Sequence, residues 1–258
     1  MLADAFLTEA VQASHYVYDF SDEFLKAFCE HWCPSTNTFI IPPGKLSISL
    51  WDFLDLGGLS VTGRLFDEVV PTGECLSQSL SEEARLPASC MFLLLGYHYL
   101  AVQSPDRRVL ASAWISFWNH SIRSYVGHEA ADRSTSKSIC PRKLSVLEHR
   151  SWDAGDRHPF DTVGASAGLE EEVYCPAFLS CWLCVFVLPA EPLGFIRAGV
   201  FKMASFMANG YRVSLAPPFL SCIYKSLSQI SLSNTPSIAP ECFPAPYLIG
   251  WMGTYLHA

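Results

Sequence analysis

Three short patterns contain the residues whose types and spacing could do chemistry, and the first is a serine motif. Gly164-Ala-Ser166-Ala-Gly168 matches the G-x-S-x-G turn that presents a nucleophilic serine. That turn needs a buried strand before the serine, with an acid and a histidine after it. Here the preceding residues are polar, no aspartate follows Ser166, and the only later histidine is His257. The sequence therefore favours a small-residue linker over a hydrolase.

The other two patterns are cysteine pairs that could bind zinc or form a redox centre. Cys29, His31 and Cys33 alternate along one stretch, and Cys181 and Cys184 form a C-x-x-C pair. A structural zinc site favours turn-rich surroundings, whereas Cys181 and Cys184 lie in an apolar run where cysteine acts as a small hydrophobic residue. Neither nucleotide-binding glycine motif occurs. We therefore expect no catalytic, cofactor-binding or metal-binding residue.

The composition indicates a folded chain with a large core. Of 258 residues, 50% are hydrophobic and only 16% are charged, with a formal net charge of −8. This charge disfavours a broad electrostatic contact with a phosphate backbone. The first residues include Asp4 and Glu9, where a signal peptide has a basic end and an apolar run. We therefore expect an intracellular, reducing environment with free thiols.

Two apolar runs, Met91 to Val102 and Ala177 to Pro189, raise the question of membrane insertion. Each is well short of the roughly 20 residues that span a bilayer. Both runs are therefore expected to be buried helices.

The densest local signals lie in residues 28–63. Thr38 to Ile41 is β-prone, a Pro-Pro-Gly turn follows, and apolar residues then alternate, which predicts a hairpin. Ser49 and Asp52 have the spacing of a helix capping box, and Gly57-Gly58 supplies a helix stop. Trp51 and Phe53 are expected to pack into the core against this hairpin.

The remaining periodicity is helical, so we expect a mainly α fold: a multi-helix globular domain with one small β-hairpin near residues 38–50. Pro34 should end the second of two short helices within residues 4–32, and Pro176 should lie near the first turn of its helix. The aromatic residues of 109–125 are expected to be core. The other expected helices are Cys90–Val102, Val109–Tyr125, Tyr174–Pro189, Ile196–Ala208, Ala216–Ile230 and Tyr247–Leu256.

Residues 127–172 are polar and rich in serine and glycine, which predicts a loop or linker. The chain is expected to be one domain, 1–258, which can divide into two helical subdomains, 1–126 and 173–258, joined by this loop. A solvated loop is the favoured interpretation of its basic residues, and a nucleic-acid patch is the alternative. Those residues are Arg133, Lys137, Arg142, Lys143 and Arg150.

The stretch 30–63 also resembles the signature of a known family. The pattern is a W-x-P-x-T-x-T-F hairpin, a short alternating strand, and a D-x-x-x-L-x-G-L helix stop that ends in glycine. The matching residues are Trp32, Pro34, Thr36, Thr38, Phe39, Gly44, Leu46, Ser47, Ile48, Asp52, Leu56, Gly58, Leu59 and Gly63. Residues 178–189, 196–231 and 247–256 resemble the later half of the same family. On these residues the sequence is similar to the plant mobile domain, also called the aminotransferase-like plant mobile domain.

The resemblance implies a biological context for the chain and does not imply a particular chemical reaction. Such domains are associated with transposable elements and with the similar MAIN-like host proteins. These proteins are linked to nuclear roles in meristem maintenance, genome stability and transposon repression. The abrupt end of the chain within a helical pattern suggests a short copy of a longer element-borne protein.

The aminotransferase label finds no support in the residues. Pyridoxal phosphate chemistry needs a Schiff-base lysine and a phosphate cup. None of the lysines lies in a Ser/Gly-rich cup: Lys26, Lys45, Lys137, Lys143, Lys202 and Lys225.

From the sequence we expect a non-enzymatic protein-interaction module of nuclear location, with an unidentified protein partner, no cofactor and no membrane contact. The alternative is a nucleic-acid-binding module of transposon origin that uses the basic residues of the 127–172 loop. The third possibility is an enzyme of unknown type.

Overall fold

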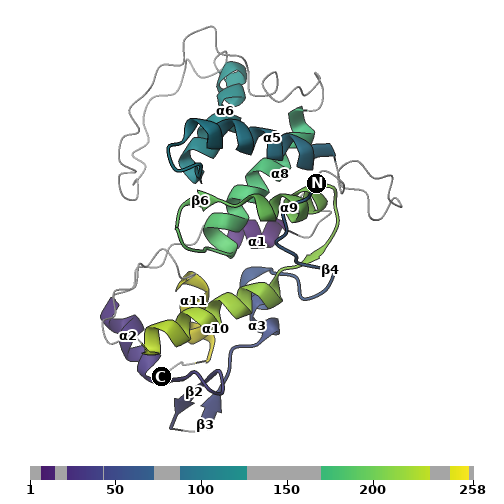
Figure 1. Cartoon of the computed structure of the whole chain (residues 1–258). Helices are drawn as coiled ribbons and strands as arrows, with labels where there is room; N and C mark the ends of the chain where they lie inside the picture. Colours follow the sequence, from purple (N-terminus) through teal and green to yellow (C-terminus); the bar gives the residue numbers. More distant parts are fainter. Residues whose placement is uncertain are drawn as a thin grey trace, which may run out of the picture.

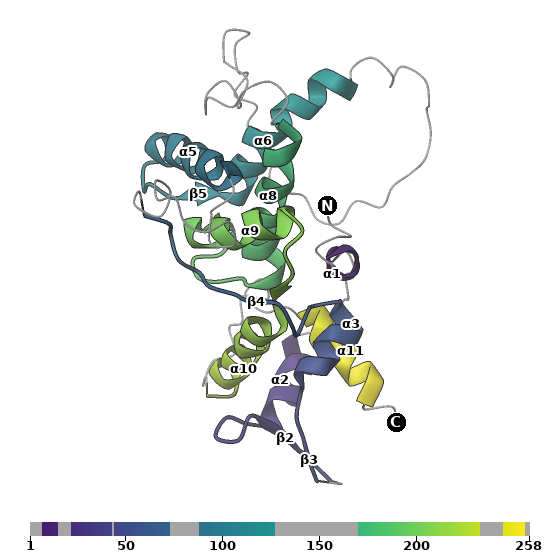
Figure 2. The same ribbon diagram turned by 90° about the vertical axis from the view of Figure 1, so that its right-hand side faces the viewer.

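The computed structural model describes residues 7–14, 22–42, 44–72, 88–126, 170–232 and 245–255. Within these ranges the chain forms nine α-helices and only short strands, which confirms the mainly α prediction. The helices gather into two groups, which lie one above the other in both views (Figures 1 and 2).

The first group, called the α8 group, surrounds the helix α8. Its helices are α5 (Ala88–Gln103), α6 (Ala111–Val126), α8 (Glu170–Trp182) and α9 (Phe201–Ala208). Trp114 of α6 is buried, donates its indole N–H to the Ala177 carbonyl oxygen at 3.0 Å, and stacks on Phe201 with ring centroids 5.3 Å apart. Trp118 is also buried. The predicted core role of these aromatic residues is confirmed for both tryptophans.

The second group, called the α10 group, contains α2 (Asp22–Glu30), α3 (Leu50–Gly57), α10 (Ala216–Leu232) and α11 (Ala245–Tyr255). A three-stranded antiparallel sheet belongs to it, formed by β1 (Trp32–Cys33), β2 (Thr38–Ile41) and β3 (Gly44–Leu46). Trp251 of α11 is fully buried, with its ring centroid 5.4 Å from that of Phe39 on β2. Each group thus combines elements from before and after residues 127–169.

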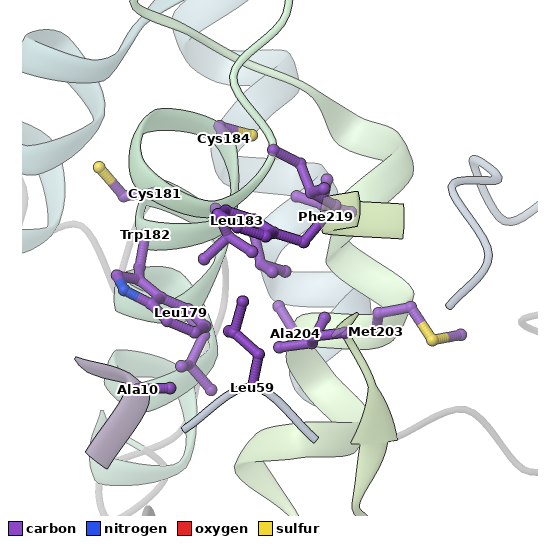
Figure 3. Close-up of a cluster of buried hydrophobic side chains, with 14 of the residues drawn as sticks. Ala10, Leu59, Leu179, Cys181, Trp182, Leu183, Cys184, Met203, Ala204 and Phe219 are labelled. Atoms are coloured by element: carbon purple, nitrogen blue, oxygen red, sulfur yellow. The ribbon is translucent and has the colours of Figure 1, made fainter. Parts of the chain in front are cut away.

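Several elements join the two groups. Ser14, which follows α1 (Thr8–Ala13), accepts a hydrogen bond from the Trp182 indole of α8 at 3.2 Å. Strand β4 (Arg64–Leu65) pairs in parallel with β7 (Val213–Ser214), which precedes α10. Figure 3 shows Phe219 of α10 in one buried cluster with Leu59, Leu183 and Ala204. One hydrophobic core therefore runs through both groups.

The hairpin and helix predicted within residues 28–63 are present. β2 and β3 pair with Phe39 opposite Leu46, and the Ser49 and Asp52 side chains each accept from the other's backbone N–H. Gly58 ends α3 in the left-handed conformation, with φ of 60°. Periodicity alone did not predict β1, because Trp32 and Cys33 continue the helical spacing of α2 although that helix ends at Glu30; the hairpin of the family signature, from Trp32 to Phe39, did include it.

Trp51 corrects one core prediction. Phe53 is fully buried, but Trp51 is 62% exposed. Residues two apart on an α-helix are separated by about 200° of rotation, so both side chains cannot face one core. The capping box fixes α3 with Phe53 inward, which turns Trp51 outward.

The expectation of two entirely buried helices was also wrong in part. Helix α5 carries no charged residue, yet Met91, Leu95 and Val102 are 39%, 42% and 62% exposed. The other α8-group helices cover only one side of α5, so the residues at positions i, i+4 and i+11 face outward. In the second run, Phe178 and Phe186 are about half exposed.

Several helix boundaries differ from the prediction. Helix α8 begins at Glu170, so Pro176 lies inside the helix and not in its first turn. The run expected to continue to Pro189 becomes a π-helix, η1 (Leu183–Val187). Residues 196–208 do not form one helix either. The strand β6 (Phe195–Ile196), which pairs with β5 (Val109–Leu110), and the 3-10 turn η2 (Ala198–Val200) precede α9.

Candidate functional site

A groove of about 460 Å³ lies where the two groups meet. Its lining comes from four parts of the chain: residues 66–68 after β4, residues 188–191 after η1, Arg197 before η2, and one side of α10. Clefts of roughly this size are common ligand sites in proteins. The groove is therefore our candidate functional site.

The amphipathic sequence of α10 explains one wall of the groove. Phe219, Ile223 and Leu227 recur every four residues and are fully buried, so the opposite side of the helix faces outward. Ser221, Lys225 and Gln229 also recur every four residues, and they lie on that exposed side. All three line the groove, together with neighbouring residues of α10.

The π-helix η1 positions the loop that lines another part of the groove. The Leu188 N–H donates to the Leu183 carbonyl at 2.8 Å, five residues back, and the chain then leaves the helix. π-helical turns are rare and often occur at functional sites. Here the loop that follows the π-helical turn, Leu188–Glu191, lines the groove.

Arg197 holds two parts of the lining together. Its Nε donates to Glu68 Oε1 at 2.5 Å, and its Nη2 donates to the Leu188 carbonyl at 2.8 Å. Partial burial lowers the pKa of Arg197, but the hydrogen bond to Glu68 and the charge interactions with Glu68, Cys184 and Cys222 together outweigh burial, so the net pKa is raised. The guanidinium is thus charged and tied to a carboxylate, so it stabilises the groove instead of offering a charge to a ligand.

Lys225 differs from Arg197 in this respect. Within the described ranges, no carboxylate forms an ion pair with Lys225, whereas Lys202 pairs with Asp67 at 2.5 Å. Lys225 is exposed on α10 and lines the groove. It is therefore the cation that the groove can offer to a ligand.

The signature residues have structural roles away from the groove. Trp32 Nε1 donates to Ser228 Oγ at 3.1 Å, and the Ser47 hydroxyl lies 3.0 Å from the Tyr224 hydroxyl, so both tie the sheet to α10. All fourteen signature residues are described, and none of them lines the groove. The signature thus builds the fold, while the groove is formed by other residues.

The cysteine patterns do not converge on a site. Burial raises the pKa of Cys29 to about 12, whereas the partly exposed Cys33 has its pKa lowered to about 7, chiefly by hydrogen bonding with Ser35. Cys181 and Cys184 are buried, and burial raises the pKa of both. Among the described residues, no group of three His, Cys, Asp or Glu side chains could hold a metal ion.

Other candidates from the sequence lie outside the described residues. These are the serine motif Gly164–Gly168 and the basic residues proposed for nucleic-acid binding, namely Arg133, Lys137, Arg142, Lys143 and Arg150.

Sequence reasoning missed the groove. The polar residues spaced by four on α10 were the one available signal, because they predict an exposed stripe. The remaining lining residues lie far away in the chain, at 66–68 and 188–197, and no local pattern brings them together.

The fold and the groove define a mainly helical domain with a mixed polar and apolar cleft. A family model for the plant mobile domain matches residues 7–243. This match covers most of the chain, so the chain belongs to the plant mobile domain family and the resemblance of the signature is confirmed. Neither a search of curated proteins nor a search of solved structures returned a significant match. In the described part of the chain, no helix is both long enough and apolar enough to cross a membrane.

Proposed function

We propose that this chain is a non-enzymatic protein-interaction module of the plant mobile domain family. The observation that carries the proposal is the groove beside α10. Seven of its thirteen lining residues are polar or charged, which is unlike the mainly apolar and aromatic lining of most small-molecule pockets. Polar groups distributed along an open groove suit the main chain and side chains of another protein.

The lining residues also argue against catalysis. Ser221, Cys222 and Ser226 could act as nucleophiles, but such residues need an adjacent base, and no histidine lines the groove. Lys225 could hold pyridoxal phosphate as a Schiff base only beside a phosphate-binding cup, and the one guanidinium in the lining, that of Arg197, is tied to Glu68. An aminotransferase reaction therefore has no support here.

The family supplies the biological setting of the proposal. Membership implies a nuclear protein linked to transposable elements, with a role in meristem maintenance, genome stability or transposon repression. We propose this nuclear setting for the chain on the basis of its family. The net charge of −8 favours a protein partner over nucleic acid.

The test uses the full chain, affinity-tagged and incubated with nuclear extract from plant tissue. Two variants are compared with the wild type: Ser221→Trp, which places a large side chain in the groove, and Gln103→Trp, at an exposed position on α5. We expect a defined set of nuclear proteins to bind the wild type and Gln103→Trp, and to bind Ser221→Trp less. Purified partners mixed with the chain should reproduce this binding. A wild-type chain that retains nothing beyond the tag alone would overturn the proposal.

A second measurement tests the nucleic-acid alternative. The wild-type chain is titrated into fluorescently labelled duplex DNA at several salt concentrations. We expect no specific binding at physiological salt. Salt-dependent binding that weakens when Arg142 and Lys143 are replaced by alanine would contradict the proposal and favour the alternative.

A further inference from the structure

We propose that the groove binds an extended peptide of a partner protein in which an acidic side chain lies next to an apolar one, and that Lys225 pairs with the acidic side chain. This inference rests on the proposed function and adds the chemistry of the partner. It is argued from the length of the groove, its hydrogen-bonding groups, its apolar surface and its charges.

The length of the groove fits a short extended segment. The lining residues of α10 run from Pro218 to Gln229. With a rise of 1.5 Å per residue, this part of the helix is about 16 Å long. An extended chain advances about 3.3 Å per residue, so about five residues of a peptide can lie along it.

The polar residues of α10 suit the main chain of such a peptide. An extended segment brings unpaired N–H and C=O groups with it, and these groups need partners when they leave water. Ser221 and Ser226 offer hydroxyl groups, and Gln229 offers both an amide donor and a carbonyl acceptor. The three side chains are spread over about two turns, so they can contact successive peptide units.

An apolar surface lies beside these polar groups. Phe66, Leu188, Pro189 and Pro218 contribute side chains from three separate segments of the lining. Together they can bury one apolar side chain of the peptide, which supplies binding energy that polar contacts in water do not. The groove thus favours a peptide with a single apolar anchor.

The charged residues of the groove favour an acidic side chain next to the apolar anchor of the peptide. Lys225 has no ion-pair partner among the described residues, while Arg197 and Glu68 neutralise each other. Lys225 lies on the α10 side of the lining, so the acidic side chain of the peptide belongs on that side. One unpaired lysine is too little charge for a phosphate backbone, which is bound by many cations.

The test uses three fluorescein-labelled libraries of nine-residue peptides. Their central pairs are Glu-Leu, Gln-Leu and Lys-Leu, and all other positions are randomised. Binding to the full chain is measured by fluorescence anisotropy. We expect the Glu-Leu library to bind most tightly and the Lys-Leu library to bind most weakly. Equal binding of the three libraries would overturn the inference.

Two lysine variants test whether the preference for the Glu-Leu library depends on Lys225. Lys225→Glu should weaken binding of the Glu-Leu library at least about threefold and improve binding of the Lys-Leu library, because an attraction becomes a repulsion. Lys45→Glu makes the same charge change at an exposed position on β3, outside the groove, and should leave both affinities unchanged. An unchanged library preference in Lys225→Glu would contradict the role of Lys225.

The two proposals can fail separately. If nuclear proteins bind the wild type and Lys225→Glu equally, the groove inference fails and the interaction function stands. If the chain binds no nuclear protein and no peptide library, both proposals fail. Selective loss of the same partners in Lys225→Glu and Ser221→Trp, with the lysine control unaffected, supports both.

Discussion

Asp52 accepts hydrogen bonds from the N-cap residue of its own helix and from α11, and its side chain is almost entirely buried. The Ser49 N–H, the Trp251 indole and the Tyr255 hydroxyl donate to it at 2.6, 3.2 and 2.6 Å. Burial raises the pKa of Asp52, but the bonds from Tyr255, Ser49 and Trp251 outweigh burial, so the net pKa is lowered. Asp52, a residue of the family signature, therefore caps α3 and also binds α11 to it through hydrogen bonds.

Asp52→Ala should lower the free energy of unfolding by about 2–4 kcal/mol, because it removes the cap and leaves the buried Trp251 indole N–H unpaired. Chemical denaturation at pH 7 measures the change. Asp55→Ala is the matched control, since Asp55 lies on the same helix and is exposed. An Asp55 variant as unstable as the Asp52 variant would show that the loss is not specific to the buried carboxylate.

The contribution of Asp52 should also depend on pH. Its folded-state pKa is lower than its unfolded-state pKa, so the stabilisation is complete above the unfolded value of about 4. It is lost as the pH falls through the folded-state pKa. The stability difference between wild type and Asp52→Ala should therefore shrink as the pH falls below about 4, and a constant difference would contradict this assignment.

Cys33 is a second residue whose chemistry is set by its neighbours. Ser35 Oγ lies 3.2 Å from its Sγ, and hydrogen bonding with Ser35 and Thr36 lowers the pKa of Cys33 to about 7. Because the thiolate is the reactive form, alkylation of Cys33 by iodoacetamide should show a midpoint near pH 7. Peptide mass spectrometry reads out each cysteine separately. Ser35→Ala should move the midpoint upward, and Cys29 should stay unmodified at pH 7.

At the scale of elements, Gly63 allows β4 to pair with β7. Its φ is +123°, and a Cβ atom there would lie 2.5 Å from the Arg212 carbonyl oxygen. The next residue, Arg64, donates its N–H to that same oxygen at 2.9 Å. Only glycine can occupy this position without moving the backbone, which explains its place in the signature.

Gly63→Ala should therefore destabilise the protein by more than about 1 kcal/mol. Gly250→Ala is the control, because nothing lies within 4 Å of a Cβ atom there. Since Gly250 lies inside α11, alanine should stabilise it by up to about 1 kcal/mol. Thermal unfolding measures the stability of both variants. A Gly63→Ala variant at least as stable as wild type would show that β4 can rearrange.

At the scale of the whole molecule, Phe219 connects the two helical groups. It is fully buried, and its ring packs against Phe53 and Tyr247 of the α10 group, each at a centroid distance of 4.7 Å. It also belongs to the cluster with Leu183 and Ala204, which lie in the α8 group and its π-helix (Figure 3). The groups are therefore expected to unfold together.

Phe219→Ala should cost about 3–5 kcal/mol, because it opens a cavity in the shared core. Tryptophan fluorescence and far-UV circular dichroism should report one coincident transition in wild type and variant. Phe186→Ala removes the same side chain at a position that is 48% exposed, and it should cost much less. Separate transitions for the two probes would show that the groups are independent.

Local sequence signals were sufficient to predict most of the helices and the local structure of residues 28–63. Capping boxes, glycine stops and apolar periodicity act over a few residues, so Ser49, Asp52 and Gly58 could be placed correctly without the rest of the chain. The family signature lies in the same stretch for this reason. Trp51 and the outward residues of α5 were misjudged, because hydrophobicity alone does not say which side of a helix is covered.

The position of the groove depends on long-range packing. Glu68 and Arg197 are 129 residues apart, yet their ion pair joins two segments of the lining. Lys225 is exposed by its position on an amphipathic helix, which the sequence could indicate, but the packing of distant segments decides that no carboxylate of the described residues forms an ion pair with it. The hydrophobic periodicity of a helix indicates which of its side chains are exposed. Packing between distant segments determines which of these exposed side chains lie close together.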